Sequence, residues 1–176
     1  MHRVAAIVAI LTAILLSSCA GVSTSSTPPP STPFPPEACG VAFPANAPTL
    51  KLAATHATET DTALPPPQSL RIERSLISAG RWFDHADGWS TLVLRLHSDH
   101  AATLSLYLNE VEIPRDAQIW VCSADGRQRH GPYREATGGQ LWTSAIKGDT
   151  LDIQVWAPSF RRVEFRGRLI EALATH

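Results

Sequence analysis

The sequence predicts an all-β protein whose main domain is an antiparallel β-sandwich, and two observations carry that prediction. Aliphatic and polar residues alternate in several separate runs, for example in Leu104-Ser105-Leu106-Tyr107-Leu108. Such alternation places the aliphatic side chains on one face of a strand, whereas a helix would scatter them around its axis. Turn-forming residues, such as Gly138-Gly139 and Lys147-Gly148-Asp149, separate the runs at intervals of about ten residues, a spacing typical of two packed antiparallel sheets.

The expected strands follow from this alternation in chain order. We expect them over residues 68–78, 91–97, 103–109, 118–123, 141–146, 150–156 and 163–169. Asp87-Gly88, Pro114-Arg115-Asp116-Ala117 and Ala124-Asp125-Gly126-Arg127 supply the turn chemistry between some of them. Short strands of this kind fit a jelly-roll, CUB-like or immunoglobulin-like sandwich.

Composition favours one globular domain and gives no support to nucleic-acid binding. The 176 residues include 15 basic and 16 acidic ones, and the arginines are spread along the chain. Nucleic-acid binding needs a basic face that neutralises phosphates, so we expect no nucleic-acid partner. Most of the 14 prolines precede Gln68, which sets the N-terminal third apart from the rest.

The N-terminus has the features of an export signal. Residues 1–3 are followed by an apolar run over 4–16, which is short for a membrane span and suits a signal peptide. The run ends in Leu16-Ser17-Ser18-Cys19-Ala20, which resembles the bacterial lipoprotein signal. The resemblance implies that Cys19 is diacylated and becomes the mature N-terminus. It also implies the outer membrane as destination, because Ala20 is not an aspartate. The alternative is an ordinary secretory signal in which Cys19 has no special role.

Four segments are expected along the chain. Residues 1–18 form the lipoprotein signal peptide, 19–36 a stalk, 37–67 a partly ordered lead-in and 68–176 the β-sandwich. The stalk is rich in Pro, Ser and Thr, so it has almost nothing to bury and is expected to stay disordered. At about 3.1 Å per residue in polyproline II it would reach roughly 50 Å, which would lift the domain off the membrane.

The cysteine count points to one disulfide. Once Cys19 carries lipid, only Cys39 and Cys122 remain. In an oxidising envelope these two have a single pairing available. We expect the disulfide, and the alternative is two separate buried thiols.

Two groups of residues have side chains that bind metals in other proteins. His97, Asp99 and His100 lie in one loop and include zinc-ligand types. Asp84 and Asp87 offer carboxylates for calcium, but the segment has fewer carboxylates than a dedicated calcium-binding loop. Polar loops between strands carry such residues by chance, so we expect no metal and no cofactor.

A hydrolase built on Ser90, His85 and Asp87 is the one catalytic arrangement that the sequence suggests. Three near neighbours in sequence seldom converge as nucleophile, base and orienting group, and no oxyanion feature accompanies them. We therefore expect no catalytic residues.

The tryptophans provide the candidate ligand surface, formed by Trp82, Trp89, Trp120 and Trp156. Trp120 and Trp156 lie on the faces opposite their aliphatic neighbours. They are therefore either exposed in a binding patch or covered by the N-terminal third of the chain, and we favour the cover.

A longer series of motifs resembles a known family. It comprises Leu104-Ser105-Leu106-Tyr107-Leu108, Ile113-Pro114-Arg115-Asp116-Ala117-Gln118-Ile119-Trp120-Val121, Asp125-Gly126, Gly131-Pro132-Tyr133, Leu141-Trp142-Thr143 and Gly148-Asp149-Thr150-Leu151-Asp152-Ile153-Gln154-Val155. The series, within residues 69–157, is similar to the non-catalytic β domain that precedes the trypsin-like domain in secreted bacterial serine endopeptidases of the lysyl-endopeptidase type. The resemblance implies a β-sandwich accessory module. It implies no protease activity, because no Gly-Asp-Ser-Gly motif occurs in the sequence up to His176.

These features together lead us to expect a lipid-anchored binding or scaffolding module of the cell envelope, with a protein partner and without enzymatic activity. One alternative is an accessory domain of a secreted serine protease system, acting as a folding helper or inhibitor. Another is a carbohydrate-binding module that uses the tryptophans.

Overall fold

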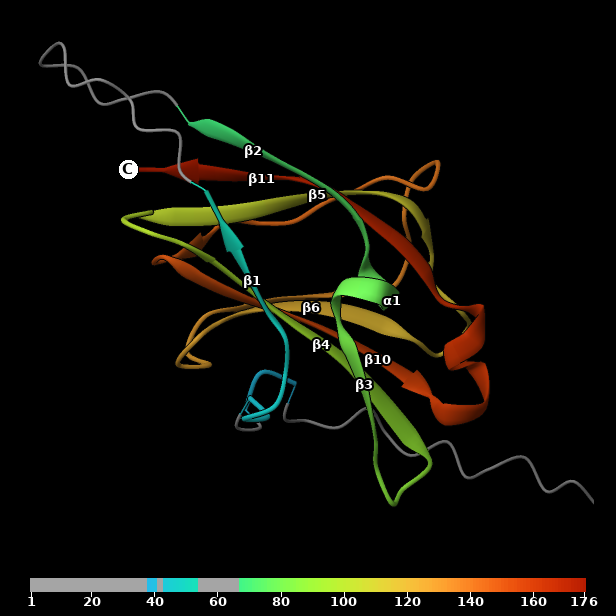
Figure 1. Cartoon of the computed structure of the whole chain (residues 1–176). Helices are drawn as coiled ribbons and strands as arrows, with labels where there is room; N and C mark the ends of the chain where they lie inside the picture. The colour runs from blue at the N-terminus through green and yellow to red at the C-terminus, as the bar shows by residue number, and fades with distance from the viewer. Residues whose placement is uncertain (1–37, 41–42, 54–66) are drawn as a thin grey trace, which may run out of the picture. The chain divides into compact units, whose positions relative to one another are not determined.

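The computed structural model describes residues 38–40, 43–53 and 67–176. Within these ranges the strands form two sheets that pack on each other (Figure 1). Almost all neighbouring strands are antiparallel. The predicted all-β sandwich is therefore confirmed.

The described strands divide into a six-stranded and a five-stranded sheet. The six-stranded sheet contains β1 (Thr49–Leu52), β3 (Arg81–Asp84), β4 (Trp89–Ser98), β6 (Gln118–Ser123), β7 (Arg129–Tyr133) and β10 (Thr150–Pro158). Its order is β1-β4-β10-β6-β7, and β3 also pairs with β4. The five-stranded sheet contains β2 (Gln68–Ser75), β5 (Thr103–Glu112), β8 (Leu141–Trp142), β9 (Ile146–Lys147) and β11 (Arg166–Thr175). Its order is β2-β11-β5-β8, and β9 also pairs with β5.

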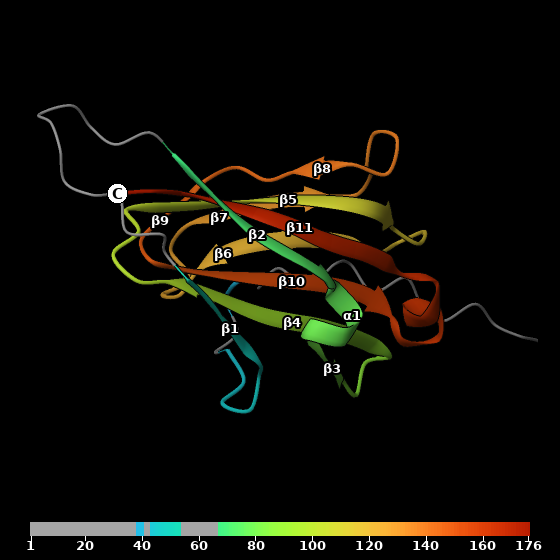
Figure 2. The same cartoon turned by 45° about the horizontal axis from the view of Figure 1, so that its top comes forward.

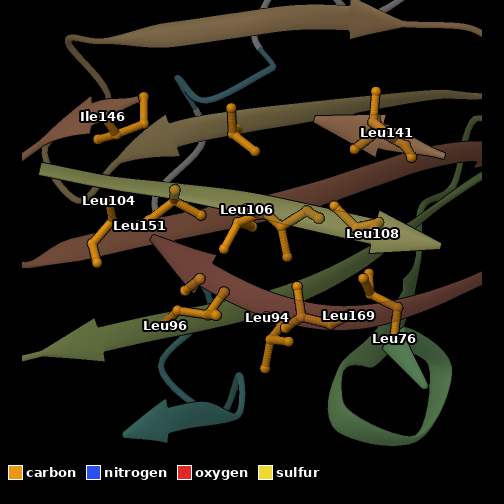
Figure 3. Close-up of a cluster of buried hydrophobic side chains, with 14 of the residues drawn as sticks. Leu76, Leu94, Leu96, Leu104, Leu106, Leu108, Leu141, Ile146, Leu151 and Leu169 are labelled. Carbon is orange, nitrogen blue, oxygen red and sulfur yellow. The ribbon is translucent and has the colours of Figure 1, made fainter. Parts of the chain in front are cut away.

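The hydrophobic core lies between the two sheets and is built mainly from leucines at alternate strand positions. Figure 3 shows these side chains pointing toward one another. Leu94 on β4, Leu106 on β5, Leu151 on β10 and Leu169 on β11 are all buried. A fully buried leucine contributes about 1.5–3 kcal/mol relative to an exposed one, so this layer is the main source of stability.

Residues 38–40 and 43–53 lie within the expected lead-in, and the structure ties both segments to the sandwich. The predicted disulfide is confirmed, because Cys39 is bonded to Cys122 on β6 with a Cα–Cα distance of 5.5 Å. Further on, β1 pairs in parallel with the second half of β4, while β3 pairs antiparallel with the first half. Two short strands therefore share one edge of β4, and β1 is the parallel exception in the antiparallel pattern.

Two predicted strands have different ends because the chain crosses from one sheet to the other there. The strand expected over 68–78 ends at Ser75, and helix α1 (Leu76–Ala79) carries the chain from β2 to β3. The strand expected over 163–169 begins only at Arg166, because residues before it form the 3-10 helix η1 (Ser159–Glu164) between β10 and β11. Val163, the first residue of that expected strand, is 77% exposed. Gly80 follows α1 at the first crossing, where the chain packs closely on β4. A Cβ there would lie 2.9 Å from Leu92 Cδ1.

The remaining differences concern short strands. The expected strand over 141–146 is two short strands, β8 and β9, which both pair with β5. Neither β1, β3 nor β7 was expected as a strand. Each of the three has five residues or fewer and pairs with one other strand at the edge of the sheet. Hydrophobic alternation is weakest in such short edge strands.

Candidate functional site

The three residues considered for hydrolysis are held by different partners. His85 Nε2 lies 2.7 Å from Thr91 Oγ1, and the Ser90 hydroxyl donates to Asp84 Oδ1 at 2.6 Å. Asp87 Oδ1 accepts a hydrogen bond from the backbone N–H two residues later in the chain, at 3.1 Å. The structure does not bring them together as nucleophile, base and orienting group.

The carboxylates considered for calcium are also engaged in local contacts. Asp84 accepts hydrogen bonds from Ser90 and from the guanidinium of Arg162. These two hydrogen bonds lower the pKa of Asp84, because both favour its ionised form. The cluster ties β3 to η1 and has the contacts of a structural network.

The loop considered for zinc is arranged around His97. Its Nδ1 lies 3.0 Å from Thr150 Oγ1 and its Nε2 lies 3.0 Å from Asp99 Oδ1. The backbone carbonyl of His100 lies 3.2 Å from His176 Nδ1. Among residues 38–40, 43–53 and 67–176, no group of three or more His, Cys, Asp or Glu side chains is placed to hold a metal ion.

A partly buried ion pair joins β4 to β10 on the outer side of the six-stranded sheet. Arg95 on β4 makes a bidentate contact with Asp152 on β10, at 2.6 and 2.7 Å. Burial raises the pKa of Asp152, and the contact with Arg95 opposes that rise. The Arg95 guanidinium also lies 4.2 Å from the ring centroid of Phe43, so this pair helps to hold the segment before β1.

Three of the four tryptophans of the predicted ligand surface lie on this outer side of the six-stranded sheet. Trp89 and Trp156 are buried and form a small cluster with Ala38, and Trp120 packs against it half-buried. The ring of His85 stacks on Trp156 with centroids 5.1 Å apart. Ala38, next to the disulfide, packs on Trp89 and Trp156, so the N-terminal third of the chain contributes to their cover.

The fourth of them, Trp82, is half-buried against the main core. It makes an edge-to-face contact with Phe165, with ring centroids 6.3 Å apart. The exposed tryptophan of the described chain is Trp142, at 53% exposure. It was not included in the predicted surface.

Trp142 and Tyr107 form an aromatic pair on the outer face of the five-stranded sheet. The two residues are cross-strand neighbours on β8 and β5, and Figure 2 shows β8 beside β5 at the outside of the sandwich. Their rings are stacked, with centroids 4.2 Å apart and planes inclined by 17°. Leu141 and Leu108, the next pair in register, point inward and are buried. Alternation along the strands therefore directs the aromatic pair outward.

Most of the other side chains on this outer face are polar, apart from the half-buried Leu173 opposite Ser105. Glu171 on β11 is the cross-strand neighbour of Tyr107, and it accepts a hydrogen bond of 2.5 Å from Ser69 on β2. In an adjacent row, Arg168 on β11 lies opposite Asn109 on β5. We call the surface formed by Trp142, Tyr107, Glu171, Arg168 and Asn109 the aromatic sheet face. It combines exposed aromatic carbon with carboxylate, amide and guanidinium groups.

Trp142 was overlooked although the sequence contains a signal for it. Trp142 follows the inward-facing Leu141, and Tyr107 lies on the polar side of its own alternating run. Alternation alone thus places both side chains on solvent-facing positions. Alternation does not reveal that β5 pairs with β8, because this pairing joins residues 35 positions apart in the sequence.

A groove of about 410 Å³ lies between β1 and β2. Aliphatic side chains line it together with three basic residues, Lys51, Arg71 and Arg74. Its two walls are joined by residues 54–66, which lie outside the described part of the chain. The aromatic sheet face is therefore the better-defined candidate site.

Comparison with protein-family models found no match, and comparison with curated proteins found none. The resemblance to the β domain of lysyl-endopeptidase-type proteases therefore stays a sequence-based prediction. The predicted signal peptide, Cys19 and the stalk lie outside the described residues. Within the described ranges, no helix has the length and apolar content needed to span a membrane.

Proposed function

We propose that the chain is a lipid-anchored, non-catalytic binding module of the bacterial cell envelope, and that the aromatic sheet face is its ligand-binding surface. The observation that carries the proposal is the stacking of the exposed Trp142 on the half-buried Tyr107, on a largely polar sheet face. Exposed aromatic side chains are concentrated at recognition surfaces, because they bury a large area with little loss of conformational freedom.

The side chains considered for catalysis and metal binding have structural contacts, which favours a binding role for the chain over a catalytic one. His85, Ser90 and Asp84 are engaged in contacts that tie β3, β4 and η1 together. A general base or nucleophile needs an open position for substrate next to it. The proposal therefore assigns these groups to the framework and places recognition on the opposite sheet.

The anchor follows from the sequence around Cys19. A thiol that carries two acyl chains, together with an acylated N-terminus, would hold the module on a membrane durably, since each buried methylene contributes about 0.8 kcal/mol. Growing cells with an alkyne-tagged palmitate should label the wild-type chain and leave Cys19→Ala unlabelled. Equal labelling of both, or labelling of neither, would remove the anchor from the proposal.

Binding through the aromatic sheet face can be tested in intact envelopes. The full chain, Trp142→Ala and Phe160→Ala would be crosslinked in cells and recovered in detergent. Phe160 is a matched control, because it is 62% exposed but lies on η1, in a different part of the molecule. We expect Trp142→Ala to lose the crosslinked species of the wild type and Phe160→Ala to keep them.

The opposite pattern would contradict the proposal. Crosslinks that persist in Trp142→Ala and disappear in Phe160→Ala would move the binding surface to the helical end of the sandwich. Thermal melting of each variant is the necessary check, since a loss of crosslinks has meaning only when the variant is folded.

A further inference from the structure

We infer that the aromatic sheet face binds a neutral, pyranose-containing glycan, with one sugar ring stacked on the indole of Trp142. This inference rests on the proposed binding role of the same surface, and it adds the chemical class of the ligand. Three features of the surface support it in turn: the free face of the indole, the neighbouring polar groups and the local charge.

The first feature is the geometry of Trp142. One face of its indole is covered by Tyr107, whose ring is nearly parallel at a centroid distance of 4.2 Å. Trp142 is nevertheless 53% exposed, so its other face is open to solvent at the edge strand β8. The C–H groups on one side of a pyranose ring form a flat apolar patch of comparable size. Stacking that patch on an indole buries carbon on both partners while the sugar hydroxyls stay directed outward.

Tyr107 contributes to this feature by holding the indole in place. A side chain that is already packed on one side loses little conformational freedom when a ligand covers the other side. The ligand then gains from a surface that is formed before it arrives. A ring on a flexible loop would provide less of this advantage.

The second feature is the set of polar groups beside the aromatic pair. A glycan bound by its apolar face still needs partners for the hydroxyls that lose water. Asn109 and Arg168 lie opposite each other in the row next to Tyr107, and within residues 38–40, 43–53 and 67–176 no hydrogen bond or ion pair engages their side chains. Glu171 accepts one hydrogen bond from Ser69, which leaves a carboxylate with further acceptor capacity. Amide, carboxylate and guanidinium groups can each form hydrogen bonds with two neighbouring hydroxyls of a sugar ring.

The third feature is the charge of the surface. Two ion pairs on this sheet cancel their own charges, Arg71 with Glu73 and Arg166 with Glu112. Beside the aromatic pair, the positive Arg168 is balanced by the negative Glu171. With Arg74, Glu110 and Lys147 included, the strands of this sheet carry five basic and four acidic residues. So small an excess gives little electrostatic attraction to a polyanion. A neutral, hydroxyl-rich ligand is the electrostatic complement of such a surface.

A glycan of this chemistry has two sources in a bacterial envelope, and the experiment separates them. One is the amino-sugar backbone of the cell wall, represented by chitotetraose. The other is surface polysaccharide, represented by lipid-free polysaccharide cleaved from the lipopolysaccharide of the producing bacterium. Calorimetric titration of the full chain in detergent would measure the affinity for each probe.

We expect at least one of the two probes to bind, and the affinity to fall about tenfold or more in Trp142→Ala, which corresponds to roughly 1.4 kcal/mol. Phe160→Ala should bind like the wild type. Trp142→Phe keeps an aromatic ring and should lose less than the alanine variant. Asn109→Ala should weaken binding while leaving the aromatic pair intact, which separates a hydrogen-bonding site from a purely apolar one.

Two results would overturn the inference. One is the absence of binding to both probes at millimolar concentration, and the other is equal binding by the wild type and a folded Trp142→Ala. If the envelope crosslinks still depend on Trp142 while no glycan binds, the surface recognises a protein, and the proposed binding role stands without this inference. If the crosslinks are also independent of Trp142, both the binding surface and its ligand class are wrong.

Discussion

Replacing both cysteines of the Cys39–Cys122 disulfide with alanine should lower the free energy of unfolding by about 4.5 kcal/mol in the chain-entropy treatment. The structure supplies the loop length, because the two residues are 83 positions apart. Cross-linking a loop of that size removes a large part of the conformational freedom of the unfolded chain. The predicted loss is comparable to the lower end of the total stability of a domain, about 5–15 kcal/mol.

The same change should uncover an aromatic cluster. The Cys39 N–H donates to Gln154 Oε1 at 3.2 Å, and that oxygen also accepts the indole N–H of Trp156 at 3.2 Å. Ala38 packs on Trp89 and Trp156. Without the disulfide these contacts alone would have to hold residues 38–40 in place. We therefore expect the tryptophan emission of the folded double variant to shift to longer wavelength.

Urea unfolding followed by circular dichroism would measure the loss, and the wild type reduced with dithiothreitol provides an independent comparison. Both samples should lose stability by a similar amount. A double variant that stays within about 1 kcal/mol of the oxidised wild type would refute the reasoning. It would mean that the cross-link does not restrict the unfolded chain as the chain-entropy treatment assumes.

Three further predictions concern the fold. Gly126→Ala should destabilise the protein, because Gly126 has a φ of 69° and a Cβ there would lie 2.4 Å from the Cys39 carbonyl oxygen. An unchanged melting temperature would show that the turns containing Gly126 and Cys39 are not packed as described. Hydrogen bonds lower the pKa of Asp84, so its stabilising contribution is complete above its ordinary pKa of 3.8 and is lost as the pH falls through the lower folded value. Melting temperatures measured from pH 6 downward should accordingly fall less steeply in Asp84→Asn, and equal slopes would contradict this. Phe165→Ala removes a fully buried ring and should cost about 3–5 kcal/mol, whereas a loss below about 1 kcal/mol in urea titrations would show that the core refills the space.

Much of the sandwich could be predicted because its long strands carry aliphatic residues at alternate positions, even where both faces of β4 and β10 are buried. The runs around Leu94, Leu106 and Ile153 alternate regularly, and β4, β5 and β10 include the predicted ranges. The errors at α1 and η1 have a different origin. There the chain leaves one sheet for the other, so a side chain such as Leu76 is buried by the end of the sandwich and not by a strand face.

The candidate site was predicted less well, and the reason is physical. Four tryptophans were chosen because large aromatic residues on polar faces suggest recognition. Whether such a ring is exposed depends on what lies over it, and Ala38 packs on Trp156 where Cys39 is bonded to Cys122 on the neighbouring strand β6. A contact between residues more than a hundred positions apart leaves no local pattern in the sequence.

By itself the sequence determined the all-β class and the alternation that selects the core leucines, and it predicted a lipoprotein-like start and the pairing of Cys39 with Cys122. These are properties of neighbouring residues or of simple counting. Only the tertiary structure decided which aromatic rings are accessible and which polar groups lie beside them. Tyr107 and Trp142 become one surface because β8 pairs with β5, and Glu171 joins them because β11 pairs with the other edge of β5. Strand order is set by packing and hydrogen bonding across the whole sandwich, and it thereby decides where the candidate binding surface lies.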